Sequence, residues 1–190
     1  MFPRLAWVSI VVAACGGATA PSRSPDPPPP IAPVATATPP RASSTAAETP
    51  APTGLLTLAQ ARPYMVQLIN RDRASEHLPP VTLDEGAPSR AGQMHADDMA
   101  HLGYLGHWGS DGSTPEQRMT EAGGADVDFE NAYCVTDEKV RPLDREPRFS
   151  PADLERAEAR GCGEKPPNDG HRKSILGKWR KRVGVGIALP

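Results

Sequence analysis

The sequence predicts a folded domain of the α+β class over residues 55–190, preceded by a signal segment and a disordered linker. Three observations support this prediction. Helix-start motifs recur along the chain, glycines alternate with apolar residues near residue 185, and a proline-rich stretch precedes the domain. A chain of 190 residues has room for one such domain with extensions. The formal net charge of −2 gives no overall field that would attract nucleic acid, so no nucleic-acid partner is expected. We also expect a monomer.

Residues 1–14 are typical of a secretory signal. Arg4 supplies a positive charge, and the apolar run 5–14 is too short to span a bilayer, which needs about 20 residues. The run ends in Val12-Ala13-Ala14-Cys15, which resembles a bacterial lipobox, in which the cysteine becomes the lipidated N-terminus. The alternative is an ordinary signal cleaved near 18–20, which would discard Cys15. We favour lipidation because Cys15 directly follows the apolar run.

Residues 15–54 are rich in Pro, Ala, Ser and Thr, and they include the polyproline run 27–30. Such a segment has too few large apolar side chains to fold, so we expect a disordered linker. At about 3 Å per residue it could reach at most ~100 Å. A lipid at Cys15 would then hold the domain away from a membrane, outside the cytoplasm.

The first two helices of the domain are predicted from their ends. Thr57 and Gln60 form a capping box, and apolar residues at helical spacing follow until Pro79-Pro80. Pro63 predicts either a kink or a later start of this helix. Asp84 is the expected cap of a second helix that Gly103 ends near residue 102.

The remaining elements follow from similar signals. Thr114-Pro115-Glu116-Gln117 predicts a short helix that ends at Gly123-Gly124. A strand is expected near 127–135, a helix over 150–161, and another helix that carries His171. The last element, 183–189, is predicted as a strand whose alternating glycines allow close packing on one face.

Cysteine use is consistent with export. With Cys15 assigned to lipid, Cys134 and Cys162 remain, and an even number in an exported protein suggests a disulfide. A bridge between them would contribute on the order of 3–4 kcal/mol through loop entropy. The alternative is two free thiols.

Eight short motifs occur in the order typical of one protein family. The chain is similar to the bacterial branch of the CAP superfamily (cysteine-rich secretory proteins, antigen 5, pathogenesis-related 1), whose domain is also called the SCP domain. The resemblance covers roughly residues 58–188. Its motifs are Leu68-x-Asn70-x-x-Arg73, Leu83-Asp84, His95-Ala96-x-Asp98-Met99, Gly103-Tyr104-Leu105-x-His107, Asp111-Gly112-x-Thr114-Pro115-x-x-Arg118, Glu130-Asn131-Ala132, Gly170-His171-Arg172-x-x-Ile175-Leu176 and Val183-Gly184-Val185-Gly186.

The resemblance implies a CAP-type α–β–α sandwich with a small antiparallel sheet and a surface cleft. It places His107, Glu130 and His171 in that cleft, and gives His95 a structural role. The family's fourth cleft residue, a Glu before the second histidine, has no secure match, and Glu155 and Glu158 are the candidates. Three departures stand out: Phe129 replaces a glycine, a tryptophan before Gly170 is missing, and the chain stops at Pro190, which implies a truncated sheet.

Two imidazoles and a carboxylate in one cleft could bind a divalent metal such as zinc, with His107 and His171 as ligands. We expect a non-enzymatic module at the cell envelope that binds a lipid, a protein or other envelope material. The alternative is a metal-dependent, peptidase-like hydrolase that uses His107, Glu130 and His171. Neither a helical His-Glu-x-x-His motif nor a Gly-x-Ser-x-Gly elbow occurs in the sequence, which favours binding over catalysis.

Overall fold

The computed structural model describes residues 52–125, 129–134 and 148–189. The predicted signal segment 1–14, Cys15 and nearly all of the linker 15–54 lie outside these ranges. The described elements are α1 (Leu58–Ser75), β1 (Thr82–Leu83), α2 (Ala87–Leu102), α3 (Pro115–Glu121), α4 (Pro151–Cys162), α5 (Gly170–Ile175) and β2 (Arg182–Val183). Among the described residues, no helix is both long enough and apolar enough to cross a membrane.

The predicted capping box at Thr57 and the predicted helix start at Thr114 both form as expected. The Thr57 hydroxyl accepts the backbone N–H of Gln60, whose side chain accepts the N–H of Thr57, and α1 begins there with Pro63 inside it. Thr114 and Gln117 repeat the arrangement at the start of α3. These signals lie within four residues of one another, so the local sequence is sufficient to form them.

The predicted C-terminal end of α2 is confirmed, but the predicted N-cap is wrong. Gly103 adopts a left-handed conformation with φ of 69° and ends the helix. The N-cap is Gly86 and not the predicted Asp84, which lies two residues before it. Its carboxylate accepts the backbone N–H of Gly86 at 2.9 Å and pairs with Arg182 at 3.0 Å.

The prediction of an antiparallel sheet was wrong, because β1 and β2 pair in parallel, with Thr82 opposite Arg182 and Leu83 opposite Val183. After Val183, the backbone of residues 185–187 forms hydrogen bonds with side chains of α2, where a sheet would have a neighbouring strand. Ser89 accepts the N–H of Val185 at 3.1 Å. Gln93 accepts the N–H of Ile187 at 3.1 Å and donates to its carbonyl at 2.9 Å. Residues 129–134, part of the expected strand 127–135, form no ladder either.

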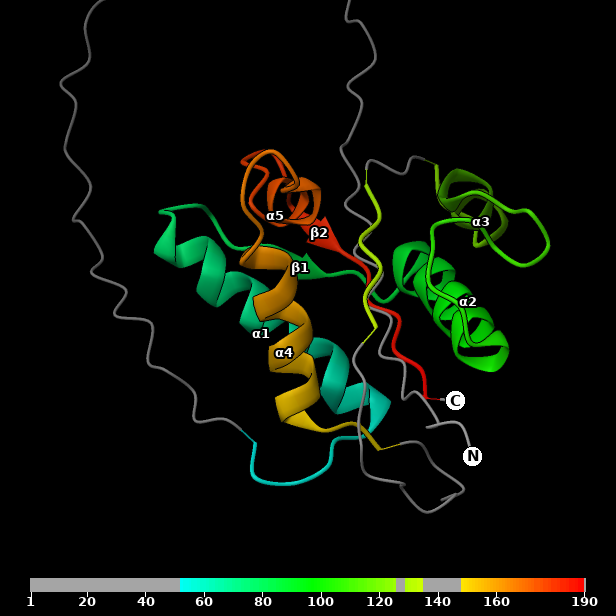
Figure 1. The fold of residues 1–190 in the computed structure, drawn as a ribbon, viewed down its shortest axis with the longest axis horizontal. Coiled ribbons are helices and arrows are strands. Elements are labelled where there is room, and N and C mark those ends of the chain that lie inside the picture. The colour runs from blue at the N-terminus through cyan, green and yellow to red at the C-terminus, as the bar shows by residue number, and fades with distance from the viewer. Residues whose placement is uncertain (1–51, 126–128, 135–147, 190) are drawn as a thin grey trace, which may run out of the picture. The chain divides into compact units, whose positions relative to one another are not determined.

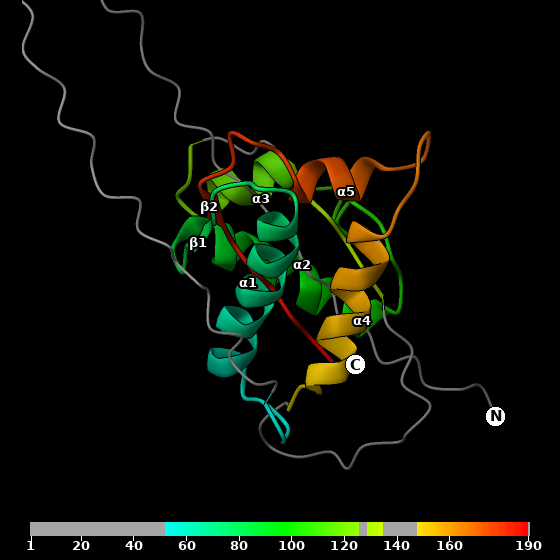
Figure 2. The same ribbon diagram turned by 90° about the vertical axis from the view of Figure 1, so that its left-hand side faces the viewer.

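The segment 184–188 lies between two helical layers. Val185 and Ile187 are buried in the main core together with side chains of α1 and α4. A Cβ atom at Gly184 or Gly186 would lie 2.2 or 2.1 Å from backbone atoms of α2, so the alternating glycines do permit close packing there. In Figures 1 and 2 this segment, drawn in red, passes between the α1–α4 pair and α2. An extended segment therefore separates two helical layers, but the predicted strand 183–189 is wrong beyond Val183, where β2 ends.

Arg73 connects α1 to the last third of the chain. Its side chain is fully buried, and it donates to the carbonyls of Pro79 (2.9 Å), Ile175 (2.7 Å) and Gly177 (3.0 Å). The planar guanidinium group reaches several acceptors at once, which a lysine would not do. This contact fixes the loop that leads from α5 to β2.

The structure does not contain the predicted disulfide, because both Cys134 and Cys162 are free thiols. They pack in different places. Cys134 lies against the small cluster of Ala96, Ala100 and Ala188 on the α2 side. Cys162 belongs to the main core at the end of α4.

Candidate functional site

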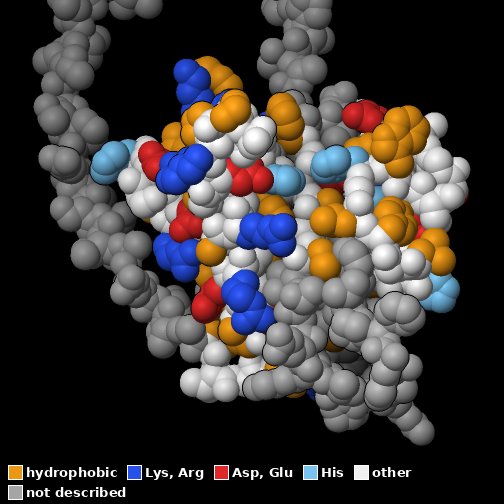
Figure 3. Space-filling model, viewed as in Figure 1, with side chains coloured by type: hydrophobic (Ala, Val, Ile, Leu, Met, Phe, Trp, Pro, Cys, Tyr) orange, Lys and Arg blue, Asp and Glu red, His pale blue; other side chains and the backbone are white. Residues whose placement is uncertain are grey.

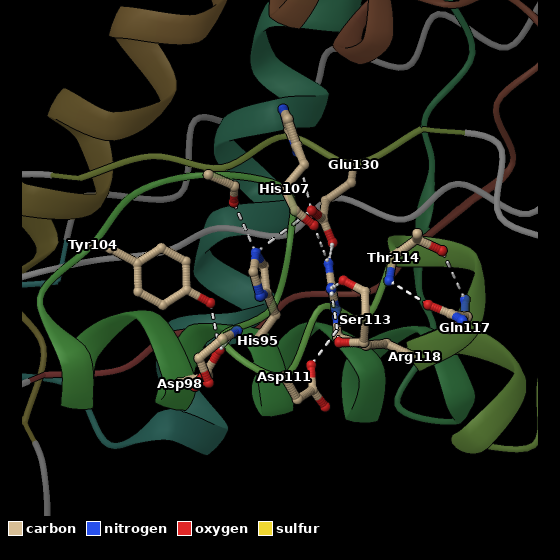
Figure 4. A network of polar contacts seen from close by, with 12 residues as sticks. His95, Asp98, Tyr104, His107, Asp111, Ser113, Thr114, Gln117, Arg118 and Glu130 are labelled. Atoms are coloured by element: carbon tan, nitrogen blue, oxygen red, sulfur yellow. Dashed lines mark hydrogen bonds and ion pairs between the residues drawn. The ribbon is translucent and has the colours of Figure 1, made fainter.

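A buried carboxylate, Glu130, is at the centre of the site (Figure 4). Its side chain is only 4 % exposed, and Arg118 donates to Oε2 at 2.8 Å. His107 contacts the other oxygen, Oε1, through Nδ1 at 3.0 Å. A buried carboxylate is costly unless it is paired or hydrogen-bonded, and Arg118 and His107 supply these partners.

Helix α3 and the loop before it position Arg118. The guanidinium group donates to the carbonyl of Ser113 at 2.8 Å and to the carbonyl of His107 at 3.0 Å. Arg118 therefore holds both the backbone of His107 and the carboxylate that contacts its ring. The chain between α2 and α3 is fixed to the site from the α3 side.

Asp98, on α2, fixes the same loop from the other side. Its carboxylate accepts the hydroxyl of Tyr104, the backbone N–H of Ser110 at 2.8 Å and the Ser110 hydroxyl at 2.6 Å. Burial opposes ionisation of Asp98, but the hydrogen bonds from Ser110 and Tyr104 outweigh it and lower the pKa of the carboxyl group. The loop that carries His107 is thus held at several points.

His95 has the structural role implied by its motif. The ring is fully buried, and Nε2 lies 2.8 Å from the carbonyl of Gly106 and 3.7 Å from Oε1 of Glu130. Desolvation is the largest influence and lowers its pKa, which favours the neutral ring. With Nε2–H donating to Gly106, it fixes the residue before His107.

Glu130 determines which ring nitrogen of His107 carries the hydrogen. A carboxylate only accepts, so Nδ1 of His107 carries the hydrogen, and in the neutral ring Nε2 keeps its lone pair. The hydrogen bond to Glu130 is the main cause of a raised pKa for His107. The side chain is 50 % exposed, so the ring remains accessible.

His171 repeats this arrangement with a different acid. Its Nδ1 lies 2.5 Å from Oε1 of Glu164, whose Oε2 accepts the backbone N–H of His171 at 2.9 Å. Burial disfavours the charged form of Glu164, but the hydrogen bond from His171 outweighs it and lowers the pKa of the carboxyl group. The Tyr133 ring packs against His171 with centroids 4.9 Å apart.

The segment Glu130–Asn131 links the two histidines. Glu130 contacts the ring of His107, while the Asn131 side-chain amide donates to the carbonyl of His171 at 3.3 Å. The three residues do not supply a single set of ligand atoms, however. Within the described ranges, the only group of three or more such atoms within 4.8 Å of one another is elsewhere, on α1 and α4.

Among the described side chains, neither of the candidate fourth acids forms a hydrogen bond or ion pair with His107 or His171. Glu155 accepts the hydroxyl of Tyr64 at 2.5 Å, and Glu158 is buried between α1 and α4. Glu164 contacts His171 instead. The only sequence signal for it was its position just before the Pro166-Pro167 break, seven residues ahead of His171.

Apolar side chains next to the site are exposed. Leu105, Trp108 and Phe129 flank His107 and Glu130 in the sequence, and Trp108 is 68 % exposed. Arg180 lies over the Phe129 ring at 4.4 Å from its centroid. Figure 3 shows histidine side chains next to hydrophobic ones on this face.

These features define an α+β domain in which separate carboxylates hold two accessible histidines. No family profile matches the chain, and no curated protein matches it. Among solved structures, the fold is similar to that of an extracellular SCP-domain protein from Bacillus anthracis str. Ames, with a TM-score of 0.52 and 19 % identity. The match covers 67 % of this chain and 37 % of that one. The chain therefore has an SCP-like fold.

Proposed function

We propose that the chain is an exported, lipid-anchored CAP-type module that binds a ligand at His107 and His171 without catalysing a reaction. The observation that carries the proposal is the matched pair of carboxylate–histidine contacts, Glu130 with His107 and Glu164 with His171. In each pair Nδ1 is occupied and Nε2 remains for a ligand. The exposed Trp108 and Phe129 favour a ligand with an apolar part.

The donor types suit a divalent metal such as zinc, but one ion shared by His107 and His171 would require side-chain movement, because the described side chains there form no single ligand group. Histidines that bind metals usually donate their second ring nitrogen to a carboxylate or carbonyl, which fixes the tautomer. His107 and His171 would hold the ion, and Glu130 and Glu164 would orient them. A bound zinc would provide a Lewis acid with open positions for a ligand oxygen.

The state of Glu130 favours binding over hydrolysis. A general base must be within reach of the proton it takes, but both oxygens of Glu130 are already engaged, one by Arg118 and the other by His107. To act as a base, Glu130 would have to leave a buried guanidinium group, which is costly.

The proposal is tested by adding zinc to the full chain and recording the side-chain nitrogen resonances of its histidines. Zinc should shift Nε2 of His107 and His171. His101→Ala, at the exposed end of α2, should leave these shifts unchanged, whereas Glu130→Gln and Glu164→Gln should each weaken binding about 10- to 100-fold. Unshifted His107 and His171 resonances at saturating zinc would exclude a metal at this site.

Zinc-dependent cleavage of peptide or cell-wall substrates by the full chain, abolished in both His107→Ala and His171→Ala, would contradict a purely binding role. The hydrolase would then be the better assignment.

A further inference from the structure

The interface between α1 and α4 contains a second group of possible metal ligands. Asp72 lies on the last turn of α1, and Glu158 and Cys162 lie four residues apart near the end of α4. Residues at that spacing share one helix face, one turn apart. Because this face packs against α1, the three side chains converge.

Glu158 is the unusual member of this group. Its side chain is fully buried, at 0 % exposure, and neither carboxylate oxygen has a hydrogen-bond partner within the described part of the chain. An unpaired buried carboxylate is strongly unfavourable. Since Glu158 points into the group with Asp72 and Cys162, a cation bound there would provide the missing partner.

We propose that Asp72, Glu158 and Cys162 form a binding site for a divalent transition metal, with zinc as the best fit. One thiolate and two carboxylates are ligand types that zinc accepts. The three ligand atoms all lie within 4.8 Å of one another. Ligands of one tetrahedral zinc are about 3.5 Å apart, so small side-chain rotations would close the site.

The surrounding charges suit such a site. A thiolate and two carboxylates carry three negative charges, which a divalent ion leaves partly uncompensated. The Arg71 guanidinium lies 2.9 Å from the Asp72 carboxylate, and that of Arg172 lies 3.5 Å from Sγ of Cys162. Binding the ion displaces the thiol proton of Cys162, and the proton of Glu158 where it is present, to solvent.

This site is separate from the His107–His171 pair and does not depend on the function proposed above. It joins the ends of two core helices, so a bound ion would stabilise their packing in the way that metal sites join facing helices in bundles. The position of Cys162 in the main core is consistent with a structural metal.

The test is a cobalt titration of the full chain after metal removal, under reducing conditions. A thiolate-to-cobalt charge-transfer band in the near ultraviolet should appear in the wild type. It should be lost in Cys162→Ser and retained in Cys134→Ser, the matched cysteine on the α2 side. A site made only of histidines gives no such band, so this readout is independent of His107 and His171.

Glu158→Gln provides a second variant that keeps the side-chain shape in case Cys162→Ser fails to fold. It should weaken cobalt binding by at least the roughly 10-fold loss that changes around metal ligands cause, and cobalt should no longer raise its melting temperature. Absence of the band in the wild type, its persistence in Cys162→Ser, or unchanged affinity in Glu158→Gln would each overturn the proposal.

Discussion

Glu130 decides which nitrogen of His107 carries the hydrogen. The carboxylate accepts from Nδ1 at 3.0 Å, and this hydrogen bond is the largest cause of the raised pKa of His107. Because the pKa is higher in the folded than in the unfolded protein, the contact stabilises the fold at pH values below about 6.5. That contribution is lost as the pH rises through the raised pKa.

A titration of the ring resonances checks this. The midpoint of His107 should lie above about 6.5 in the wild type and fall towards that value in Glu130→Gln. Glu164→Gln serves as the control, because Glu164 contacts His171 and not His107. A midpoint that is the same in Glu130→Gln and the wild type would show that Glu130 does not set the ionisation of His107.

The buried Glu158 should give the metal-free protein an unusual pH dependence. Desolvation, reinforced by nearby Asp72 and opposed by Arg71, raises the pKa of Glu158 to about 8. The folded state then binds a proton more tightly than the unfolded state. Stability therefore falls as the pH rises from the unfolded pKa of 4.5 towards 8, by up to about 1.4 kcal/mol per pH unit.

Denaturant unfolding with a chelator present measures this slope. Glu158→Gln removes the ionisable group, so its stability should change less over this pH range and should exceed that of the wild type at the alkaline end. The neighbouring Tyr133 and Cys162 have pKa values raised by burial and remain uncharged over the range. Parallel curves for the wild type and Glu158→Gln would rule out this role of Glu158.

At the scale of elements, contact between α2 and the segment 184–188 depends on glycine. A Cβ at Gly186 would lie 2.1 Å from the carbonyl carbon of Gly92 and 2.4 Å from the backbone nitrogen of Gln93. These are backbone atoms of a helix and have little room to move. Separation of the two elements would also stretch the hydrogen bonds between Gln93 and Ile187.

Gly186→Ala should therefore lower the free energy of unfolding by about 1–3 kcal/mol, as overpacked cores do. Gly170→Ala is the matched control, since a Cβ there meets no atom within 4 Å. Chemical denaturation of both variants makes the comparison. An equal, small effect of the two substitutions would mean that the elements are less tightly packed than described.

The sequence predicted the helices better than the sheet, and the difference has a physical basis. The Thr57 and Thr114 caps depend on residues three positions away, and Gly103 ends α2 by its own conformation. The pairing of Thr82 with Arg182 joins distant parts of the chain. No local signal showed that Ser89 and Gln93 would take the place of a strand beside 185–187.

For the candidate site, too, local motifs could be predicted from the sequence, whereas contacts between separate segments could not. His107, Glu130 and His171 were predicted as site residues because each lies in a short motif. Their partners were harder to predict. The contact of Glu130 with Arg118, and that of His171 with Glu164, depends on the conformation of the chain between the two residues. Cys134 and Cys162 were expected to pair from their number alone, but they pack in different clusters.

The location of the whole molecule depends on Cys15, which remains a prediction. The apolar run 5–14 is too short to anchor the chain by itself, since a bilayer span needs about 20 residues. Lipidation with two or more acyl chains would be sufficient for stable anchoring.

Cys15→Ser should therefore move the full chain from the membrane fraction to the soluble fraction of an expressing bacterium, with loss of the lipid mass in mass spectrometry. Cys134→Ser is the control and should stay with the membrane, because its thiol packs inside the domain. If Cys15→Ser stayed in the membrane fraction after an alkaline wash, a lipid on Cys15 would not be the anchor. Because a chain cleaved near 18–20 loses Cys15 entirely, a soluble wild type lacking this residue would favour the ordinary signal and leave the domain free of the membrane.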